Sequence, residues 1–272
     1  MNRIWYVAVG GALVFSAQQQ AFAGAWTLPQ GDSYNKFGIA FFESDDTFGP
    51  SVDGFEEFTD ITLNYYAEYG ITDNITLFGQ IPLRETTNTI AGVETENSGV
   101  GDVDIGFRFN LLNEKNVLAL QLLYKTPFAY NDDDELPLGN GQADFETRLQ
   151  YGRSLYPYGY VGLEAGYRFR AEAPSDEIRY QLEYGIDIKE NYYFRTKLDG
   201  TETTGSTAAT LTQTGNPSFP LAFDLGRLEL TGGYKISEQS TVEFTYTRNI
   251  YGDNILRGNT FQLAFVFAPK NQ

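Results

Sequence analysis

Charged side chains of both signs recur at every second position in several segments, which places them on one face of an extended strand. Glu146 and Arg148 are one such pair. A carboxylate beside a guanidinium forms a charge-assisted ion pair, and two carboxylates together can act as the acid and base of a hydrolase. The residues of this face that we predict to line a pore are Arg108, Glu146, Arg148, Glu164, Arg168, Arg179, Glu183 and Arg195.

The chain contains no histidine and no cysteine. A Ser–His or Asp–His base, a thiolate nucleophile and a thiolate metal site are therefore excluded. A hydrolase that uses two of the glutamates named above remains formally open. We favour the alternative that those glutamates pair with Arg148, Arg168 and Arg179 on neighbouring strands, because charges in a polar interior need partners. We predict that the protein is not an enzyme and holds no cofactor.

The N-terminus has the pattern of a secretory signal peptide. Arg3 precedes an apolar run from Ile4 to Phe15, and Ala21-Phe22-Ala23 forms an A-x-A cleavage site. The run is shorter than the about 20 residues that a membrane-spanning helix needs. We predict that residues 1–23 are removed and that residues 24–272 form a single mature domain.

Alternation of apolar and polar residues extends through most of the mature chain. From Ile61 to Tyr69 the odd positions are apolar or aromatic, and from Ile178 to Ile188 the even positions are. This period predicts strands with one apolar and one polar face. The same test predicts twelve strands, at residues 34–43, 58–69, 75–84, 101–110, 117–125, 142–154, 159–170, 176–188, 192–200, 222–235, 241–250 and 259–267.

The connections between these strands alternate in length. The short ones are Gly70–Asn74, Leu111–Asn116, Leu155–Tyr158, Lys189–Asn191 and Ile236–Ser240. The others are Ser44–Glu57, Glu85–Val100, Thr126–Gly141, Ala171–Ser175, Thr201–Leu221 and Tyr251–Gly258, of which only Ala171–Ser175 is no longer than the short turns. An even number of membrane-length strands with short turns at one end and long loops at the other is typical of outer-membrane proteins. We predict an all-β, twelve-stranded, antiparallel transmembrane β-barrel in a bacterial outer membrane, with both termini on the periplasmic side.

The odd or even position of a residue along its strand, which we call its parity, also separates the charges of the chain. The inward parity carries the basic residues Lys36, Arg84, Arg108, Lys125, Arg148, Arg168, Arg170, Arg179, Arg195, Lys197, Arg227 and Lys235. It carries the acidic residues Asp60, Glu68, Asp102, Asp104, Asp144, Glu146, Glu164, Glu177, Glu183, Asp187, Asp199, Glu229 and Glu243. The interior is thus nearly neutral, although the whole chain has a net charge of −17. Most of the surplus acidity therefore falls on loops, turns and strand ends.

This acidity bears on the partners of the protein. Nucleic acid is an improbable partner, because its phosphates would be repelled. The acidic run Asp132–Glu135 could bind Ca²⁺ or Mg²⁺ through its carboxylates, but it lacks the regular spacing of a dedicated calcium loop. A solvated loop tip is the favoured interpretation. The partners that we expect are outer-membrane lipid, lipopolysaccharide, the barrel-assembly machinery and a small solute.

Several short motifs resemble those of known outer-membrane barrels. The segments Tyr69–Leu77, Gln80–Leu83, Gly99–Gly106, Gly233–Ser237 and Phe261–Phe267 are similar to a family described as putative transporters of the MetA pathway of phenol degradation. The start Ala23–Gly31 also resembles XagA-type barrels that accompany exopolysaccharide synthesis. The family name implies aromatic solutes, whereas the inward charges favour a polar one. Phe267 is followed by residues 268–272, which departs from the aromatic final residue usual in such barrels.

We predict a passive channel or transporter-like protein for small molecules. The alternative is a structural or surface protein associated with exopolysaccharide or biofilm. The inward charges could create a transverse field, with Arg148, Arg168 and Arg179 opposite the glutamates at a constriction. They could equally form a salt-bridged plug that seals the lumen. An open passage favours transport, and a sealed network favours the structural role.

Overall fold

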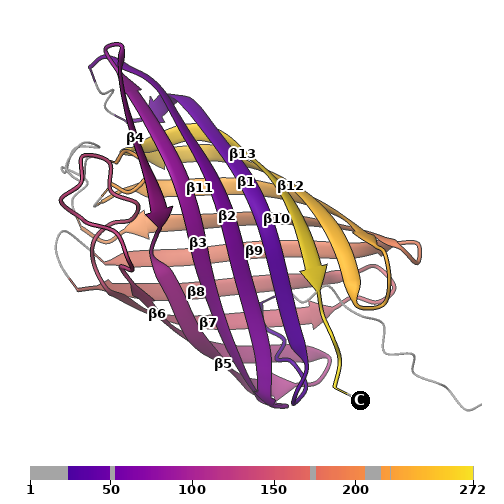
Figure 1. Cartoon of the computed structure of the whole chain (residues 1–272). Coiled ribbons are helices and arrows are strands. Elements are labelled where there is room, and N and C mark those ends of the chain that lie inside the picture. Colours follow the sequence, from indigo (N-terminus) through magenta and orange to yellow (C-terminus); the bar gives the residue numbers. More distant parts are fainter. Residues whose placement is uncertain (1–23, 50–52, 172–175, 206–215, 221, 272) are drawn as a thin grey trace, which may run out of the picture.

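The computed structural model describes residues 24–49, 53–171, 176–205, 216–220 and 222–271. These residues form a closed antiparallel β-barrel (Figure 1). The strands are β1 (Ser33–Phe48), β2 (Phe55–Thr72), β3 (Ile75–Ile90), β4 (Val93–Val100), β5 (Val103–Asn113), β6 (Asn116–Thr126), β7 (Asp144–Ser154), β8 (Tyr160–Arg170), β9 (Glu177–Ile188), β10 (Tyr192–Thr203), β11 (Asp224–Lys235), β12 (Ser240–Asp253) and β13 (Ile255–Phe267).

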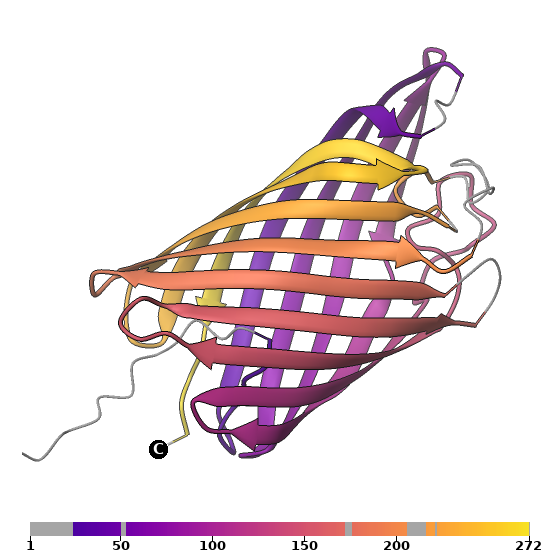
Figure 2. The same cartoon turned by 180° about the vertical axis from the view of Figure 1, so that it is seen from behind.

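Strands that are adjacent in sequence pair in space, and β1 pairs with β13 to close the barrel. Both β4 and β5 pair with β3, through Leu83–Ile90 and Ile75–Gln80 respectively, so these two strands occupy one position in the ring. The barrel therefore has twelve strand positions, as predicted. Figure 2 shows strands β7 to β11 side by side at a common tilt.

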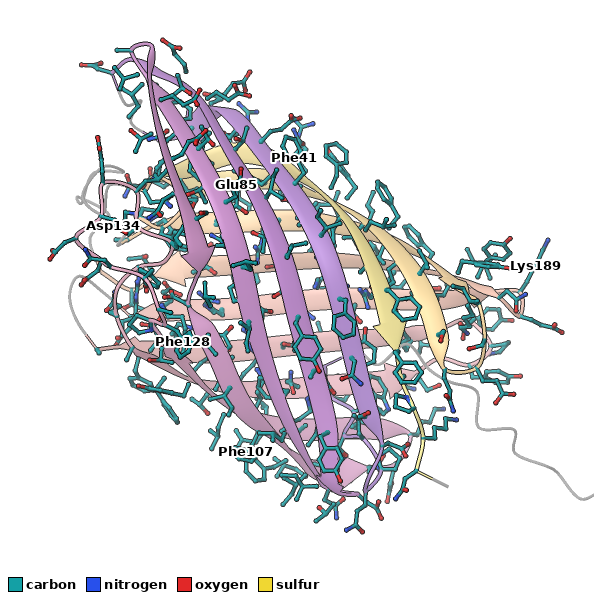
Figure 3. All side chains as sticks on the ribbon, viewed as in Figure 1. Phe41, Glu85, Phe107, Phe128, Asp134 and Lys189 are labelled. Atoms are coloured by element: carbon teal, nitrogen blue, oxygen red, sulfur yellow. The ribbon has the colours of Figure 1, made fainter. Side chains whose placement is uncertain are left out.

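The exterior of the barrel is apolar. Phe107 is 41% exposed and Phe244 is 53% exposed although both are large and hydrophobic, and Figure 3 shows Phe107 and Phe41 on the outside of the wall. Such side chains are stable in this position only against lipid, because water would leave their apolar area unburied. The apolar face of the strands is exposed at Ile61, Leu63, Ile105, Phe107, Leu163, Leu182 and Phe244, as the alternation of apolar and polar residues predicts.

One end of the barrel has only short turns among the described residues, whereas the long β6–β7 loop, residues 127–143, lies at the other end. Lys189, in the turn between β9 and β10, and Asp134, between β6 and β7, lie at opposite ends (Figure 3). The start of β1 pairs with the end of β13, so the first and last strands meet at the short-turn end. We call this end periplasmic and the other end extracellular, following the usual orientation of outer-membrane barrels.

Two segments predicted to be loops are strands instead. Residues 85–100 form most of a β3–β4 hairpin that extends beyond the barrel, and it turns at Ala91 and Gly92, which both have positive φ. Residues 251–258 are also strand, except for Asn254 at φ 57°. In residues 85–90 and 94–99 threonine, asparagine, serine and glutamate occupy both faces of the strands, so the alternation of apolar and polar residues disappears there. Asparagine tolerates the left-handed conformation that a one-residue connection needs.

The loop between β6 and β7 folds inward at the extracellular end. Its Leu136 is 1% exposed and packs in a small hydrophobic cluster with Phe58 of β2 and Leu256 of β13. This cluster joins strands from both sides of the β1 position and narrows the mouth of the barrel. In the part of the chain that the structure describes, no helix is long and apolar enough to cross a membrane.

Candidate functional site in the barrel lumen

The inward charges are paired along the wall of the lumen. Except for Arg257–Asp46 at the rim, the ion pairs of the described residues join members of the basic and acidic inward sets predicted from parity. The period of two in a strand is what makes this prediction possible, since it assigns every second side chain to the interior.

The largest network lies on strands β6 to β9. Glu146 is 0% exposed and is contacted by Arg148 at 2.7 Å, by Arg168 at 2.9 Å and by Arg179 at 3.7 Å. Arg148 also reaches Glu164 at 2.7 Å. The register brings these groups together, because Glu146 lies opposite Arg168 in the β7–β8 pair. This arrangement confirms the predicted pairing for Glu146 and Glu164.

Glu183 behaves differently from the other two glutamates. Its carboxylate accepts a hydrogen bond of 2.7 Å from the hydroxyl of Tyr160. The Tyr160 ring lies over Gly185, where a Cβ atom would approach it to 2.4 Å. The expectation that the glutamates face Arg148, Arg168 and Arg179 across a constriction is wrong in geometry. Glu146 and Glu164 instead contact arginines of the same wall, on β7, β8 and β9, because neighbours within a sheet are closer than residues on opposite walls.

A second network covers the facing wall. Glu243 of β12 bonds Lys36 of β1 at 2.6 Å, and Arg195 of β10 approaches the same carboxylate at 3.9 Å. The hydroxyl of Tyr193 also donates to Glu243. Arg108 forms a separate pair with Glu68 at 3.0 Å, and both side chains are almost fully buried. Since each wall holds charges of both signs, the structure does not separate the charges as a transverse field requires.

The paired charges leave two cavities in the lumen. The upper one, about 480 Å³, lies in the extracellular half and is lined by β1 to β3, β5, β6 and β10 to β13. The lower one, about 320 Å³, lies towards the periplasmic end. Of the predicted pore-lining residues, the lower cavity is lined by Arg108, Arg148, Glu164, Glu183 and Arg195, while Glu146, Arg168 and Arg179 line neither cavity.

The two cavities meet at a waist. Both are lined by Asn64, Gln80, Gln262 and Lys197, which lie on β2, β3, β13 and β10. Three of these side chains are neutral amides, and Lys197 pairs with Glu229 at 3.2 Å. Amides offer both donors and acceptors without a fixed charge. A waist of this kind suits polar solutes of either sign or none.

The segment before β1 crosses the lumen at its periplasmic end. Leu28 is 3% exposed, and its backbone N–H donates to Thr76 of β3 at 2.8 Å. The Trp26 carbonyl accepts a hydrogen bond from Arg108 at 3.0 Å, and the Trp26 ring meets the Tyr160 ring of β8 edge-on at 5.8 Å. The segment thus spans from β3 to β8 and narrows the exit from the lower cavity.

The alternation pattern of the sequence does not predict this segment. The signal was present, because Ala25, Trp26 and Leu28 are apolar residues outside any strand that could place them against lipid. Gly70 of β2 is a second sequence feature that reflects the position of this segment. A Cβ atom at Gly70 would lie 2.0 Å from the Pro29 carbonyl oxygen, so only glycine allows the segment to approach β2.

The loop at the extracellular mouth is held by polar contacts as well as by Leu136. Lys125 bonds Asp102 and Asp144, each at 2.9 Å. The hydroxyl of Tyr130 donates to Asp102 at 2.5 Å. Burial, then the hydrogen bond to Asp102, raise the pKa of Tyr130 above its ordinary value, so this phenol stays protonated as a donor.

The acidic run of this loop forms no cation site among the described residues. Asp134 accepts hydrogen bonds from Asn97 at 3.0 Å and from Asn131 at 3.2 Å, while Asp132 and Asp133 are exposed. No group of three or more carboxylates in the part of the chain that the structure describes is arranged to hold a metal ion. The favoured interpretation of a solvated tip therefore applies to Asp132 and Asp133.

A closed antiparallel barrel with an apolar exterior and a charged interior defines an outer-membrane β-barrel protein. No family model and no curated protein match this chain. Solved structures do match: the chain is similar to the COG4313 outer membrane channel from Pseudomonas putida F1, with 16% identity, a TM-score of 0.70 and coverage of 91% of this chain and 99% of that one.

Two further structures share the fold. The NanC porin has 9% identity, a TM-score of 0.56 and coverage of 85% of this chain and 98% of that chain. The translocator domain of the autotransporter NalP from Neisseria meningitidis has 9% identity, a TM-score of 0.58 and coverage of 90% of each chain. At these identities the likeness concerns the fold, so the function is argued from the lumen.

Proposed function

We propose that this protein is a passive channel of the outer membrane for small polar solutes, without catalysis. The observation that carries the proposal is the pair of cavities that meet at Asn64, Gln80, Gln262 and Lys197. Together they extend through both halves of the barrel, and charged and amide side chains line them. Such groups replace part of the hydration of a polar solute as it passes.

The periplasmic segment limits the rate and size of what passes. Trp26 and Leu28 lie in the path from the lower cavity to the short-turn end. The proposal therefore includes a narrow channel with a small conductance rather than a wide pore. Twelve strands are also fewer than the sixteen to eighteen of porins with wide aqueous channels.

The alternative of a structural surface protein would need a sealed interior. The ion pairs instead follow the walls and leave space between them, which favours transport. The predicted removal of residues 1–23, the contact with lipopolysaccharide and assembly by the barrel-assembly machinery are parts of this proposal. The kinship with the MetA-pathway family and with XagA-type barrels likewise remains a prediction.

The experiment is a single-channel recording of the purified, folded protein in a planar lipid bilayer. We expect small, discrete current steps whose ion preference is weak, because each wall carries both charges. Heat-modifiable migration on a denaturing gel verifies folding in the same sample. A folded protein that gives no current steps at any voltage would contradict the proposal.

A further inference from the structure

The ion pair between Asp60 and Arg84 in the lumen is longer than a closed pair. Asp60 Oδ2 of β2 and Arg84 Nη1 of β3 are 3.6 Å apart, whereas Arg108–Glu68 is closed at 3.0 Å. Both atoms are buried, and within the described residues neither has a hydrogen-bond partner. Asp60 is only 6% exposed, and its other oxygen accepts from Thr62. Unpaired buried donors and acceptors are costly, so this pair is suited to a ligand that satisfies both.

The Asp60–Arg84 pair faces the upper cavity, and so do several apolar side chains. Phe42 and Phe219 line the cavity and are partly exposed, whereas Phe58 and Leu138 are buried beneath its surface. The Arg84 guanidinium lies over the Phe219 ring at 4.6 Å, which fixes the cation at the edge of the apolar surface. The cavity thus combines an acceptor, a donor and an aromatic wall. Its volume of about 480 Å³ falls within the range of small-molecule sites.

The charges of the pair define the head group of the ligand. A lone anion would satisfy Arg84 but would be repelled by Asp60, and a lone cation would meet the reverse situation. A zwitterion places its carboxylate on the guanidinium and its ammonium on the carboxylate, so both buried atoms gain charge-assisted hydrogen bonds. The apolar wall then favours a ligand with a hydrophobic body.

We propose that the upper cavity is a binding site for a small zwitterion with an apolar side chain, of the α-amino acid class, held by Asp60 and Arg84 against Phe42 and Phe219. This inference rests on the proposed channel function and deepens it. A solute that enters from the extracellular side would reach this site first. Asn64, whose Oδ1 is also buried and unpartnered among the described residues, lies further along β2 at the waist.

The test uses four probes: L-phenylalanine, the cation 2-phenylethylamine, the anion 3-phenylpropanoate, and glycine, which is a zwitterion without the ring. Each is added to the extracellular side of the channel in planar bilayers, and block of the current is measured. We expect L-phenylalanine to block at a concentration about tenfold lower than any other probe. Equal block by all four probes would overturn the proposal.

Two variants make the test specific. Asp60→Asn leaves Arg84 uncompensated, so the preference should move to 3-phenylpropanoate. Arg84→Gln leaves the negative charge of Asp60 uncompensated, so the ligand preference should move to 2-phenylethylamine. The matched control is Arg257→Gln, which breaks an exposed pair with Asp46 at the rim and should leave the order of probes unchanged. Retention of the wild-type order in both lumen variants would refute the site.

Calorimetry of L-phenylalanine binding to the folded protein in detergent separates this inference from the channel proposal. Binding that is lost in both lumen variants supports the site even if the protein passes no current. Current without such binding, and without discrimination among the probes, leaves the channel proposal intact and overturns the site. A variant that fails to show heat-modifiable migration is replaced by Asp60→Glu, which keeps the charge and should weaken binding without reversing the preference.

Discussion

At the scale of single residues, the role of an inward charged side chain depends on how deep it lies behind the wall of the lumen. Glu146 and Arg148 are two residues apart and both point inward, yet Arg148 lines the lower cavity while Glu146 is buried behind it. How deeply an inward side chain is buried depends on the size of the side chains next to it. Arg148, for example, lies opposite Gly166, which has no side chain to cover it. A pattern of period two carries no information on that.

The buried position of Glu146 leads to a prediction about stability. Replacing it by glutamine keeps the shape but leaves Arg148, Arg168 and Arg179 without their shared carboxylate. Breaking a buried ion pair by removing one partner costs about 3–5 kcal/mol. Urea unfolding in detergent should show a loss of this size. Asp46→Asn is the control at an exposed pair and should cost less than about 1 kcal/mol.

A second prediction separates lining from supporting arginines. Arg148→Gln removes a positive charge from the lower cavity and leaves Glu164 facing it, so reversal potentials should shift towards cation selectivity. Arg168→Gln removes the same charge from a side chain that lines neither cavity. It should lower stability with little change in selectivity. Identical selectivity in the two variants would show that the lining assignment is wrong.

At the scale of elements, the sequence predicted strands well where they contact lipid and poorly beyond it. The apolar half of the pattern in β2, β5 and β9 comes from membrane contact, and these strands were found close to their true bounds. In the β3–β4 hairpin, threonine, asparagine and glutamate cover both faces, so the region from Glu85 to Val100 had the composition of a loop. These strands form because they pair with each other, and the pattern of apolar and polar residues along the chain does not show such pairing.

The segment before β1 gives a prediction at the same scale. Deleting Ala25–Pro29 removes Trp26 and Leu28 from the periplasmic end of the lumen, so the single-channel conductance should rise severalfold. Replacing the same five residues by a Gly/Ser sequence of equal length keeps the chain but removes its anchors to Thr76 and Tyr160. That variant should open and close more often. Wild-type conductance in the deletion would mean that the narrowest point lies elsewhere.

At the scale of the whole molecule, charge is segregated from the lumen, and the position of the long loops gives the barrel an orientation. The lumen is nearly neutral, while the residues outside it carry almost all of the net charge of −17. At the extracellular end the acidic groups Asp132 and Asp133 are exposed on the inward-folded loop. The long β6–β7 loop lies at this end, and outer-membrane barrels usually carry their long loops on the extracellular side. The long-loop end should therefore face the outside of the cell.

This orientation can be tested on living cells, because the chain contains no cysteine and each introduced thiol is unique. Asp133→Cys places a thiol on an exposed loop residue, and Lys189→Cys places one in the turn at the opposite end (Figure 3). A membrane-impermeant maleimide added to intact cells should label the first variant at once. It should label the second only after the outer membrane is permeabilised. The reverse order would invert the barrel in the membrane, and with it the side from which a solute first meets Asp60 and Arg84. Equal labelling of both variants in intact cells would show that the outer membrane does not separate the two ends.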